Sequence, residues 1–287
     1  MSPVANRIFS RRKFLLGAAG AITAGGLYAR FAESQRLRVS RHEVRLTAIP
    51  PAGAPLRIVQ LSDLHASRVV PLEFIAEAVI LALAQKPDLI ALTGDFVTDS
   101  QTGPHGYAEI LARLSETTPT FACLGNHDGG VARPHAPSNP TVKPVVDLLA
   151  RARIPCLVNE HRALTVRDRK LQLIGLGDLW SAMCAPAIAF AQTPARDGAT
   201  RIVLNHNPDA KELLRAHDWD LMLCGHTHGG QVRLPFLGVP LAPVTDKRYI
   251  EGLHRWENRW LHITRGVGNL HGIRINCRPE ISVLDLS

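Results

Sequence analysis

Short apolar runs alternate along the chain with longer stretches that have the composition of helices. Leu72–Ala84 is rich in apolar residues and contains neither Gly nor Pro, so with Pro71 before it the pattern predicts a helix that has Pro in its first turn. Tyr107–Leu114 and Val142–Arg151 are compatible with two further helices. The short runs predict strands at Arg57–Leu61, Asp88–Leu92, Thr120–Leu124, Arg162–Val166, Leu171–Leu176, Arg201–Leu204, Leu221–Cys224, Arg248–Leu253, Trp260–Thr264 and Glu280–Leu286.

The order of these elements predicts a fold class and the place of a site. Strands that alternate with helices favour a layered α/β sandwich. Arg162–Val166 and Leu171–Leu176 flank Asp168-Arg169 and are expected to form an antiparallel pair. Five other strands each end in a cluster of Asp, His or Asn. Because a sheet gathers such loops at its carboxyl edge, we expect a site there.

The net charge of +8 does not indicate a nucleic-acid-binding protein. Residues 1–45 hold nine of the 33 Lys and Arg but only two of the 25 Asp and Glu, so 24 basic and 23 acidic groups remain for the rest of the chain. The body is therefore nearly neutral and implies no basic face. Aromatic residues make up 5%, too few to suggest stacking platforms for single strands. We expect no nucleic acid as a partner.

The remaining composition is that of a folded protein without a disulfide framework. Apolar residues make up 46% and charged residues 20%, which excludes a disordered chain. The five cysteines are scattered and form no CxxC pair. Cys123 and Cys224 lie in apolar runs and are expected to be small buried residues.

Residues 1–35 have the pattern of an export signal or an N-terminal anchor. Ser10-Arg11-Arg12-Lys13 precedes the uncharged run Phe14–Ala29, which is 16 residues long and ends before Arg30. This run is shorter than the roughly 20 residues of a spanning helix. The pattern resembles a twin-arginine signal, read by the export machinery for folded proteins, and an ordinary secretory signal or a short anchor is the alternative. No clean cleavage site precedes Glu33, so retention as an anchor stays open, and residues 36–287 are expected to form the folded domain.

The clusters at the strand ends have the residue types of a transition-metal site. Side chains two residues apart share a face of an extended segment, so Asp63 with His65, and His226 with His228, are expected to aim two ligands into one space. Imidazole and carboxylate together suit Mn, Zn, Fe or Ni rather than Ca. The glycines that open three clusters are expected to let the backbone turn sharply toward the ions. The clusters are Asp63-Leu64-His65, Gly94-Asp95, Gly125-Asn126-His127-Asp128, Asn205-His206 and Gly225-His226-Thr227-His228.

The order of these clusters resembles that of the calcineurin-like metallophosphoesterase superfamily, over residues 55 to 287. Gly225–Pro235 (GHTHGGQVRLP), the tail Cys277–Ile281 and the N-terminal segment are similar to its bacterial exported, YaeI/YkuE-like branch of phosphodiesterases. The resemblance implies a four-layer α/β/β/α sandwich with a dinuclear metal site at the carboxyl edge of the sheets.

The resemblance also implies two divalent transition-metal ions and their ligands. One ion would be held by Asp63, His65 and His228, the other by Asn126, His206 and His226, and Asp95 would bridge them. The second set has one carboxylate fewer and is expected to bind more weakly. Two such ions would lower the pKa of a shared water, and the resulting metal-bridging hydroxide would attack phosphorus while both ions polarise the phosphoryl oxygens.

His127 is the candidate proton donor to the leaving oxygen, since alternation is expected to turn it away from the ion held by Asn126 and toward the substrate. The alternative is a third imidazole ligand. Related protein phosphatases carry an Asp three residues after the bridging Asp, which orients this His, and then an Arg that binds phosphate. Thr98 and Asp99 stand at these positions, so Asp99 or Asp128 would have to orient His127. The missing Arg disfavours a phosphoprotein phosphatase.

Other candidate phosphate contacts are less specific. Arg133, Arg265 and Arg274 are basic residues that would suit this role, with a surface or structural role as the alternative for each. Gly129–Pro144 contains four prolines and predicts a long irregular loop, which is either a substrate lip or a variable surface loop.

These observations predict an exported enzyme of the periplasm or cell envelope, either released or anchored in the membrane, that hydrolyses phosphodiester or pyrophosphate bonds. Its substrate would be an envelope lipid, a wall polymer or a nucleotide, and a lipid-linked pyrophosphate fits if Phe14–Ala29 stays in the membrane. One alternative is a wall- or membrane-associated binding protein that keeps the metal site for structure. Another is a nuclease of the same superfamily, which the nearly neutral body disfavours.

Overall fold

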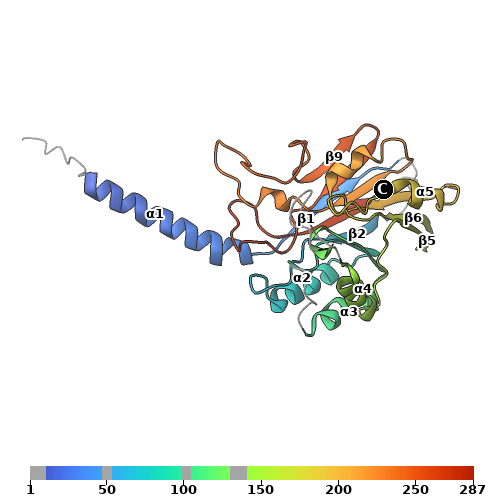
Figure 1. Cartoon of the computed structure of the whole chain (residues 1–287), viewed down its shortest axis with the longest axis horizontal. Coiled ribbons are helices and arrows are strands. Elements are labelled where there is room, and N and C mark those ends of the chain that lie inside the picture. The colour runs from blue at the N-terminus through green and yellow to red at the C-terminus, as the bar shows by residue number, and fades with distance from the viewer. Residues whose placement is uncertain (1–10, 47–53, 99–104, 130–140) are drawn as a thin grey trace, which may run out of the picture.

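Two mixed β-sheets packed face to face, with helices on their outer faces, form the body of the protein (Figure 1). The structure is a computed structural model and describes residues 11–46, 54–98, 105–129 and 141–287. The loop expected at Gly129–Pro144 therefore lies largely outside the described residues, as do Asp99 and Arg133.

The first sheet contains β1 (Arg38–Val44), β2 (Leu56–Leu61), β3 (Leu89–Thr93), β4 (Thr120–Cys123) and β11 (Glu280–Leu286). The second contains β5 (Glu160–Val166), β6 (Arg169–Gly175), β7 (Thr200–Leu204), β8 (Leu221–Cys224), β9 (Gly252–Trp256) and β10 (Arg259–Ile263). The α-helices are α1 (Arg11–Phe31), α2 (Leu72–Ala84), α3 (Tyr107–Thr117), α4 (Lys143–Arg151) and α5 (Pro186–Ala191). The short 3-10 helices are η1 (Glu33–Gln35), η2 (His127–Gly129), η3 (Pro208–Glu212) and η4 (His228–Gly230).

Parallel strands occupy the middle of both sheets. The strand order is β1-β11-β2-β3-β4 in the first sheet and β5-β6-β7-β8-β10-β9 in the second. β2, β3 and β4 run parallel, as do β6, β7, β8 and β10. The loops that follow these strands therefore leave from the carboxyl edge of their sheet, where the polar clusters lie.

Three apolar layers make the fold a four-layer α/β/β/α sandwich, as expected. Helices α2, α3 and α4 cover the outer face of the first sheet, where Ile75 belongs to the same cluster as Val59. Ile58 and Leu173 lie in the layer between the sheets. Met222 faces the third layer, beneath α5 and η3. The neighbours Ile58 and Val59 thus face opposite layers, which is the pattern of a strand buried on both faces.

Most predicted elements are confirmed, and the differences have local causes. The helix predicted at Leu72–Ala84 and the strand at Glu280–Leu286 have the expected bounds, and β5 and β6 form the expected antiparallel pair. The prediction of a strand at Arg248–Leu253 is wrong. The Asp246 carbonyl accepts the N–H of Tyr249 at 3.0 Å and closes a turn there, so β9 begins only at Gly252.

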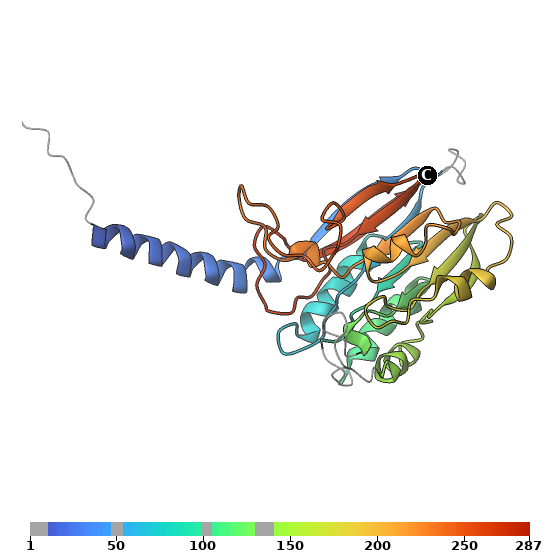
Figure 2. The ribbon, with the colours of Figure 1, turned by 45° about the horizontal axis from the view of Figure 1, so that its top comes forward.

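Helix α1 leaves the body at one end, and its last turn contacts the loop before β11 (Figures 1 and 2). The Ala29 carbonyl accepts the N–H of Arg274 at 3.2 Å, and Glu33 Oε1 accepts the N–H of Cys277 at 2.8 Å. The apolar run in the sequence ends before Arg30, but helix α1 continues to Phe31. Arg30 does not end the helix because a basic residue is favourable in the last turn of a helix. The 22 residues Phe14–Gln35 include an 18-residue window of mean hydropathy 1.2, so by length and composition alone this segment could cross a membrane.

Candidate metal centre

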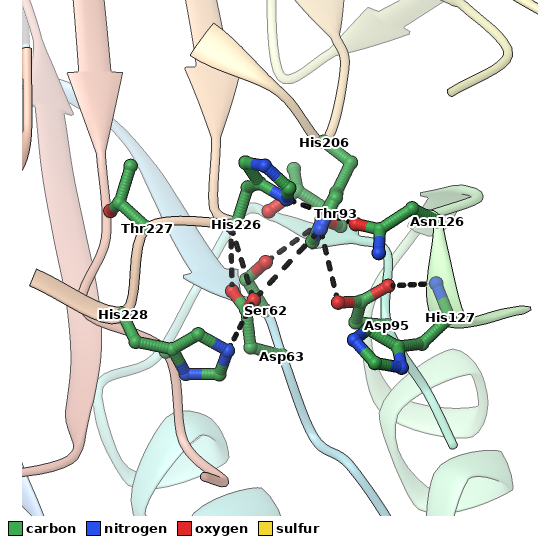
Figure 3. A network of polar contacts seen from close by, with 12 residues as sticks. Ser62, Asp63, Thr93, Asp95, Asn126, His127, His206, His226, Thr227 and His228 are labelled. Carbon is green, nitrogen blue, oxygen red and sulfur yellow. Dashed lines mark hydrogen bonds and ion pairs between the residues drawn. The ribbon is translucent and has the colours of Figure 1, made fainter. Parts of the chain in front are cut away.

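The seven predicted metal ligands converge between the carboxyl edges of the two sheets, and Figure 3 labels all of them except His65. Each of them is nearly inaccessible to solvent. They follow β2, β3 and β4 of the first sheet and β7 and β8 of the second. They are Asp63, His65, Asp95, Asn126, His206, His226 and His228.

One group of donors surrounds a point beside β2. Asp63, His65, Asp95 and His228 each offer a ligand atom, and these four atoms lie within 4.8 Å of one another. Nε2 of His65 and Nε2 of His228 are 3.2 Å apart. Asp63 Oδ1 lies 3.3 Å from His228 Nε2, and Asp95 Oδ2 lies 3.4 Å from His65 Nε2. Two imidazole nitrogens this close to each other and to two carboxylates form a donor set for one cation.

A second group shares Asp95 with the first. His206 Nε2 lies 3.1 Å from Asp95 Oδ2, and His226 Nδ1 lies 2.9 Å from Asn126 Oδ1. The rings of His206 and His226 stand edge to face, with their centroids 5.0 Å apart. Asp95 thus lies beside donors of both ligand sets that the resemblance implied.

The fit of these residues to cations follows from their hydrogen bonds. The Thr93 carbonyl oxygen accepts a hydrogen bond from His206 Nδ1 at 2.7 Å, and a carbonyl cannot donate. The neutral ring therefore has a lone pair on Nε2. This atom is buried, makes no hydrogen bond in the described part of the chain, and lies 3.1 Å from a carboxylate oxygen. A buried Nε2 this close to a carboxylate needs either a proton or a metal ion between the two atoms, so the site fits a cation.

The protonation states agree with this fit. Burial lowers the pKa of His65 to about 3 and holds that of His228 well below its usual value, so both rings are neutral near pH 7 and able to bind a metal. Burial also acts to lower the pKa of His206, but the carboxylates of Asp95 and Asp63 raise it well above its usual value in the metal-free chain. Cation binding is therefore expected to displace a proton from His206.

The ligands converge for a different reason from the one the sequence pattern suggested. Asp63 and His65 do not continue a strand: their φ angles are +53° and +49°, in the left-handed region. Asp95, His226 and His228 have φ angles of +56°, +72° and +50°. Non-glycine residues rarely adopt this region, and such strain gathers at functional sites. Tight left-handed turns, rather than the alternation of an extended strand, aim these side chains into one space.

The glycines of the clusters have two different roles. Gly94 has a φ of +84° and turns the backbone, as expected. Gly125 and Gly225 instead allow close approach: a Cβ on Gly125 would lie 2.2 Å from Asp95 Oδ1, and one on Gly225 would lie 2.3 Å from Asp63 Oδ2. The expectation that all three glycines make sharp turns is therefore wrong for these two.

Replacing Gly225 by Ala tests this close approach. The added methyl group would meet Asp63 Oδ2 and Ser62 Oγ, at 2.3 and 2.0 Å, and displace a ligand. We expect weaker metal binding and a loss of stability of about 1–3 kcal/mol, measured by metal titration and thermal unfolding. Gly26→Ala in α1 is the control, because no heavy atom lies within 4 Å of its added Cβ. Unchanged metal affinity in Gly225→Ala would contradict the packing argument.

His127 lies at the edge of the site and is held by the backbone. Its Nδ1 donates a hydrogen bond to the Thr98 carbonyl oxygen at 2.7 Å, and its own N–H donates to Asp95 Oδ1 at 2.9 Å. The Thr98 carbonyl thus holds Nδ1 of His127; of the two orienting candidates, Asp99 lies outside the described residues, and Asp128 is bonded to backbone N–H groups. Nε2 remains for a substrate in the cavity that His127 lines.

Asp128 has a structural role that its position in the sequence did not reveal. Its Oδ2 accepts the N–H groups of Asp95 and Gly125 at 2.9 and 2.8 Å, and its Oδ1 accepts that of Phe96 at 2.7 Å. The carboxylate therefore ties the loop after β3 to the loop after β4. It positions Asp95 and does not contact His127 through any of these bonds.

Two of the candidate phosphate contacts are used inside the protein. Arg274 is fully buried and donates to the carbonyl oxygens of Arg265 at 2.8 Å and Gly268 at 2.6 Å. Arg265 pairs with Glu251 at 2.6 Å. Their partners fit the structural alternative stated for each in the sequence analysis.

A cavity of about 700 Å³ opens onto the metal centre. Asp95, His127 and His226 lie in its wall, and so does Trp180, whose ring stands edge-on to that of His226 with centroids 4.3 Å apart. The sequence analysis missed Trp180, because it lies in an irregular segment between β6 and α5 with no motif around it. Much of the remaining wall is apolar and comes from three segments, residues 230–232, 240–243 and 270–273.

The fold and the donor set define a metal-dependent phosphoesterase, and sequence comparison agrees. A family model described as calcineurin-like phosphoesterase matches residues 56–230. The chain belongs to this family.

Its relatives place it in a bacterial branch. Phosphodiesterase YaeI of Escherichia coli is 43% identical, over 97% of this chain and 100% of the relative. The uncharacterized metallophosphoesterase YkuE of Bacillus subtilis is 32% identical, over 96% of this chain and 97% of the relative. UDP-2,3-diacylglucosamine pyrophosphatase LpxG of Chlamydia trachomatis is 28% identical, over 90% and 92%. The resemblance to the YaeI/YkuE-like branch is thereby confirmed, and the chain is a hydrolase of phosphoric esters.

Proposed function

We propose that the protein hydrolyses phosphodiester or pyrophosphate bonds with two divalent transition-metal ions. The observation that carries the proposal is the pair of buried donor groups that share Asp95, with His127 beside them on the wall of one cavity. Asp63, His65 and His228 would hold one ion, and Asn126, His206 and His226 the other. Two such ions supply a nucleophile from water near neutral pH and stabilise negative charge on the phosphoryl oxygens.

The chain's own residues complete this chemistry. The Asp95 carboxylate carries the charge common to both donor groups, and its Oδ1 also fixes the backbone of His127. The Thr98 carbonyl holds the Nδ1 proton of His127, so a proton for the leaving oxygen would come from Nε2 of the charged ring. The buried ring of His206 is oriented by Thr93, which keeps its Nε2 directed at Asp95.

We further propose an amphiphilic phosphoester from the cell envelope as substrate. The cavity joins the metal centre to an apolar wall that includes Leu241 and Ile273, so it offers a place for both a phosphate and a hydrocarbon group. The relative LpxG is named for a diacylated sugar nucleotide, which has both kinds of group. The apolar lining of the cavity favours such a substrate over a cell-wall polymer or a free nucleotide.

Residues 1–35 would serve as the address or anchor and residues 36–287 as the catalytic domain. Arg11, Arg12 and the apolar helix α1 support export by the twin-arginine machinery to the periplasm or cell envelope. The candidate span Phe14–Gln35 supports retention in the membrane after export.

Hydrolysis of bis(p-nitrophenyl) phosphate and p-nitrophenyl phosphate, each with added Mn²⁺, tests the proposal. We expect turnover of the diester, loss of that turnover with a chelator, and recovery on adding metal back, since the ions would supply the nucleophile and stabilise the phosphoryl charge. Tight metal binding without turnover of either compound would contradict the proposal and favour the binding protein that keeps its metal for structure.

A further inference from the structure

A hydrophobic hairpin projects from the body beside the mouth of the cavity. Leu234 and Gly238 exchange both backbone hydrogen bonds, at 2.8 and 2.9 Å, and so close a tight turn over Pro235-Phe236-Leu237. The Phe236 side chain is fully exposed and that of Leu237 is 77% exposed. Phe236 also has a φ of +65°, a conformation that is rare for an aromatic residue. A strained turn that places two large apolar side chains in water indicates a contact surface.

The base of this hairpin is fixed to the segment that receives α1. The N–H of Arg233 donates to the Ile275 carbonyl at 2.8 Å, and the N–H of Ile275 donates to the Gln231 carbonyl at 2.9 Å. Next to Ile275, the N–H of Arg274 donates to the Ala29 carbonyl of α1. A continuous set of backbone bonds thus joins the hairpin to the end of the candidate membrane span. The orange and red loops that hold these residues gather where α1 meets the body (Figure 2).

The cavity continues this apolar surface toward the metal centre. Leu241, 80% exposed, and Ile273, 40% exposed, both line the cavity, so its wall reaches the outer surface near the hairpin. Asp95 and His228 line the same cavity at the metal centre. A molecule with a hydrocarbon chain and a phosphate would therefore place the chain toward the hairpin and the phosphate toward the donors.

We propose that the hairpin Leu234–Gly238 inserts into the surface of a lipid bilayer, so that the enzyme takes the chain of a lipid phosphoester directly from the membrane into its cavity. The occupant is a bilayer because α1, which has the length of a membrane span and exposes Phe14, Leu15 and Leu16, ends at the same segment. Phe236 and Leu237 are the inserted side chains, since insertion depends on buried apolar area. The use of a lipid substrate rests on the function proposed above.

Insertion is tested without activity by placing a fluorophore on the hairpin. The full chain carrying Phe236→Trp is reconstituted in vesicles of phosphatidylcholine, with or without bromine on the acyl chains. Against the background of the four native tryptophans, we expect brominated lipid to quench the added emission. Ile188→Trp on α5, a position that is 55% exposed, is the matched control and should show no added quenching. Equal quenching of the two variants would overturn the proposal that the hairpin inserts into the bilayer.

Two substrates that release the same leaving group, one in the membrane and one in solution, test whether insertion of the hairpin assists the use of a lipid substrate. Two double variants of the full chain are compared. The hairpin variant carries Phe236→Ser and Leu237→Ser, and the control variant carries Ile80→Ser and Ile188→Ser. All four side chains are exposed and lie outside the cavity wall. For hexadecyl p-nitrophenyl phosphate in vesicles we expect kcat/KM of the hairpin variant to fall about tenfold or more, with bis(p-nitrophenyl) phosphate turnover unchanged. Equal effects on both substrates, or equal effects of both variants, would overturn the proposal. If the wild-type chain hydrolyses neither compound, the proposed function fails, while the quenching experiment still decides on insertion.

Discussion

Replacing Asp95 by Asn is expected to reduce phosphodiester turnover by about 10³-fold or more, equivalent to about 4 kcal/mol of transition-state stabilisation. Asn keeps the shape of the side chain but removes the charge that both donor groups share. In the native chain, Asp95 Oδ2 lies 3.1 Å from His206 Nε2 and 3.4 Å from His65 Nε2. Without that charge two cations would repel each other with less compensation, so the metal content should also fall below two ions per chain. Steady-state kinetics together with elemental analysis measures both effects.

A matched Asp→Asn change separates this effect from a general loss of stability. Asp285 forms a two-point ion pair with Arg57, at 2.7 and 3.1 Å, on β11 and away from the metal centre. Asp285→Asn should leave turnover and metal content unchanged. If Asp95→Asn kept two ions and full activity, the bridging role of Asp95 would be wrong.

His127→Ala is the second change with a large expected effect, and it depends on the leaving group. The ring is held through Nδ1 by Thr98, so its removal takes away the proton at Nε2 without removing a proposed metal ligand. General acid catalysis contributes about 10²–10⁴-fold, and this matters most for leaving groups that cannot depart as anions. Across ethyl aryl phosphates from p-nitrophenyl to unsubstituted phenyl, we expect a small loss for the first compound and at least about a 100-fold loss for the last.

Metal content distinguishes the two roles considered for His127. The variant should retain both ions, and His161→Ala, on β5 of the second sheet, should behave as the wild-type protein does. Loss of an ion from His127→Ala would make His127 a ligand. An equal loss of rate for every leaving group would exclude it as the proton donor.

The sequence predicted the central strands well because buried strands in parallel sheets form continuous apolar runs. β2, β3, β7 and β8 are of this kind. β1 was missed because Arg38–Val44 is mostly polar and charged; it lies at the sheet edge, where it pairs only with β11 in the described structure. The helix α5 was also missed, since six residues are too few to give a periodic pattern.

The members of the site were predictable from the sequence, but their geometry was not. A strand end followed by Asp or His is visible in the sequence, and the five clusters together pointed to one site. The left-handed backbone at Asp63, Asp95 and His226 is not visible, because nothing in these residue types requires it. The hydrogen bond that holds Nδ1 of His127 was also hidden, since its acceptor is the carbonyl of Thr98, a group that every residue has. The positions of Trp180 and of the hairpin at Phe236 beside the cavity could not be predicted from the sequence, because they depend on how the chain folds.

Anomalous diffraction from crystals of the full chain grown with Mn²⁺ tests the proposed two-ion site, because it locates cations independently of activity. We expect two Mn peaks that both contact the Asp95 carboxylate, one among Asp63, His65 and His228 and the other among Asn126, His206 and His226. A single peak that is not in contact with Asp95, or ordered Mn only elsewhere on the protein, would contradict this expectation.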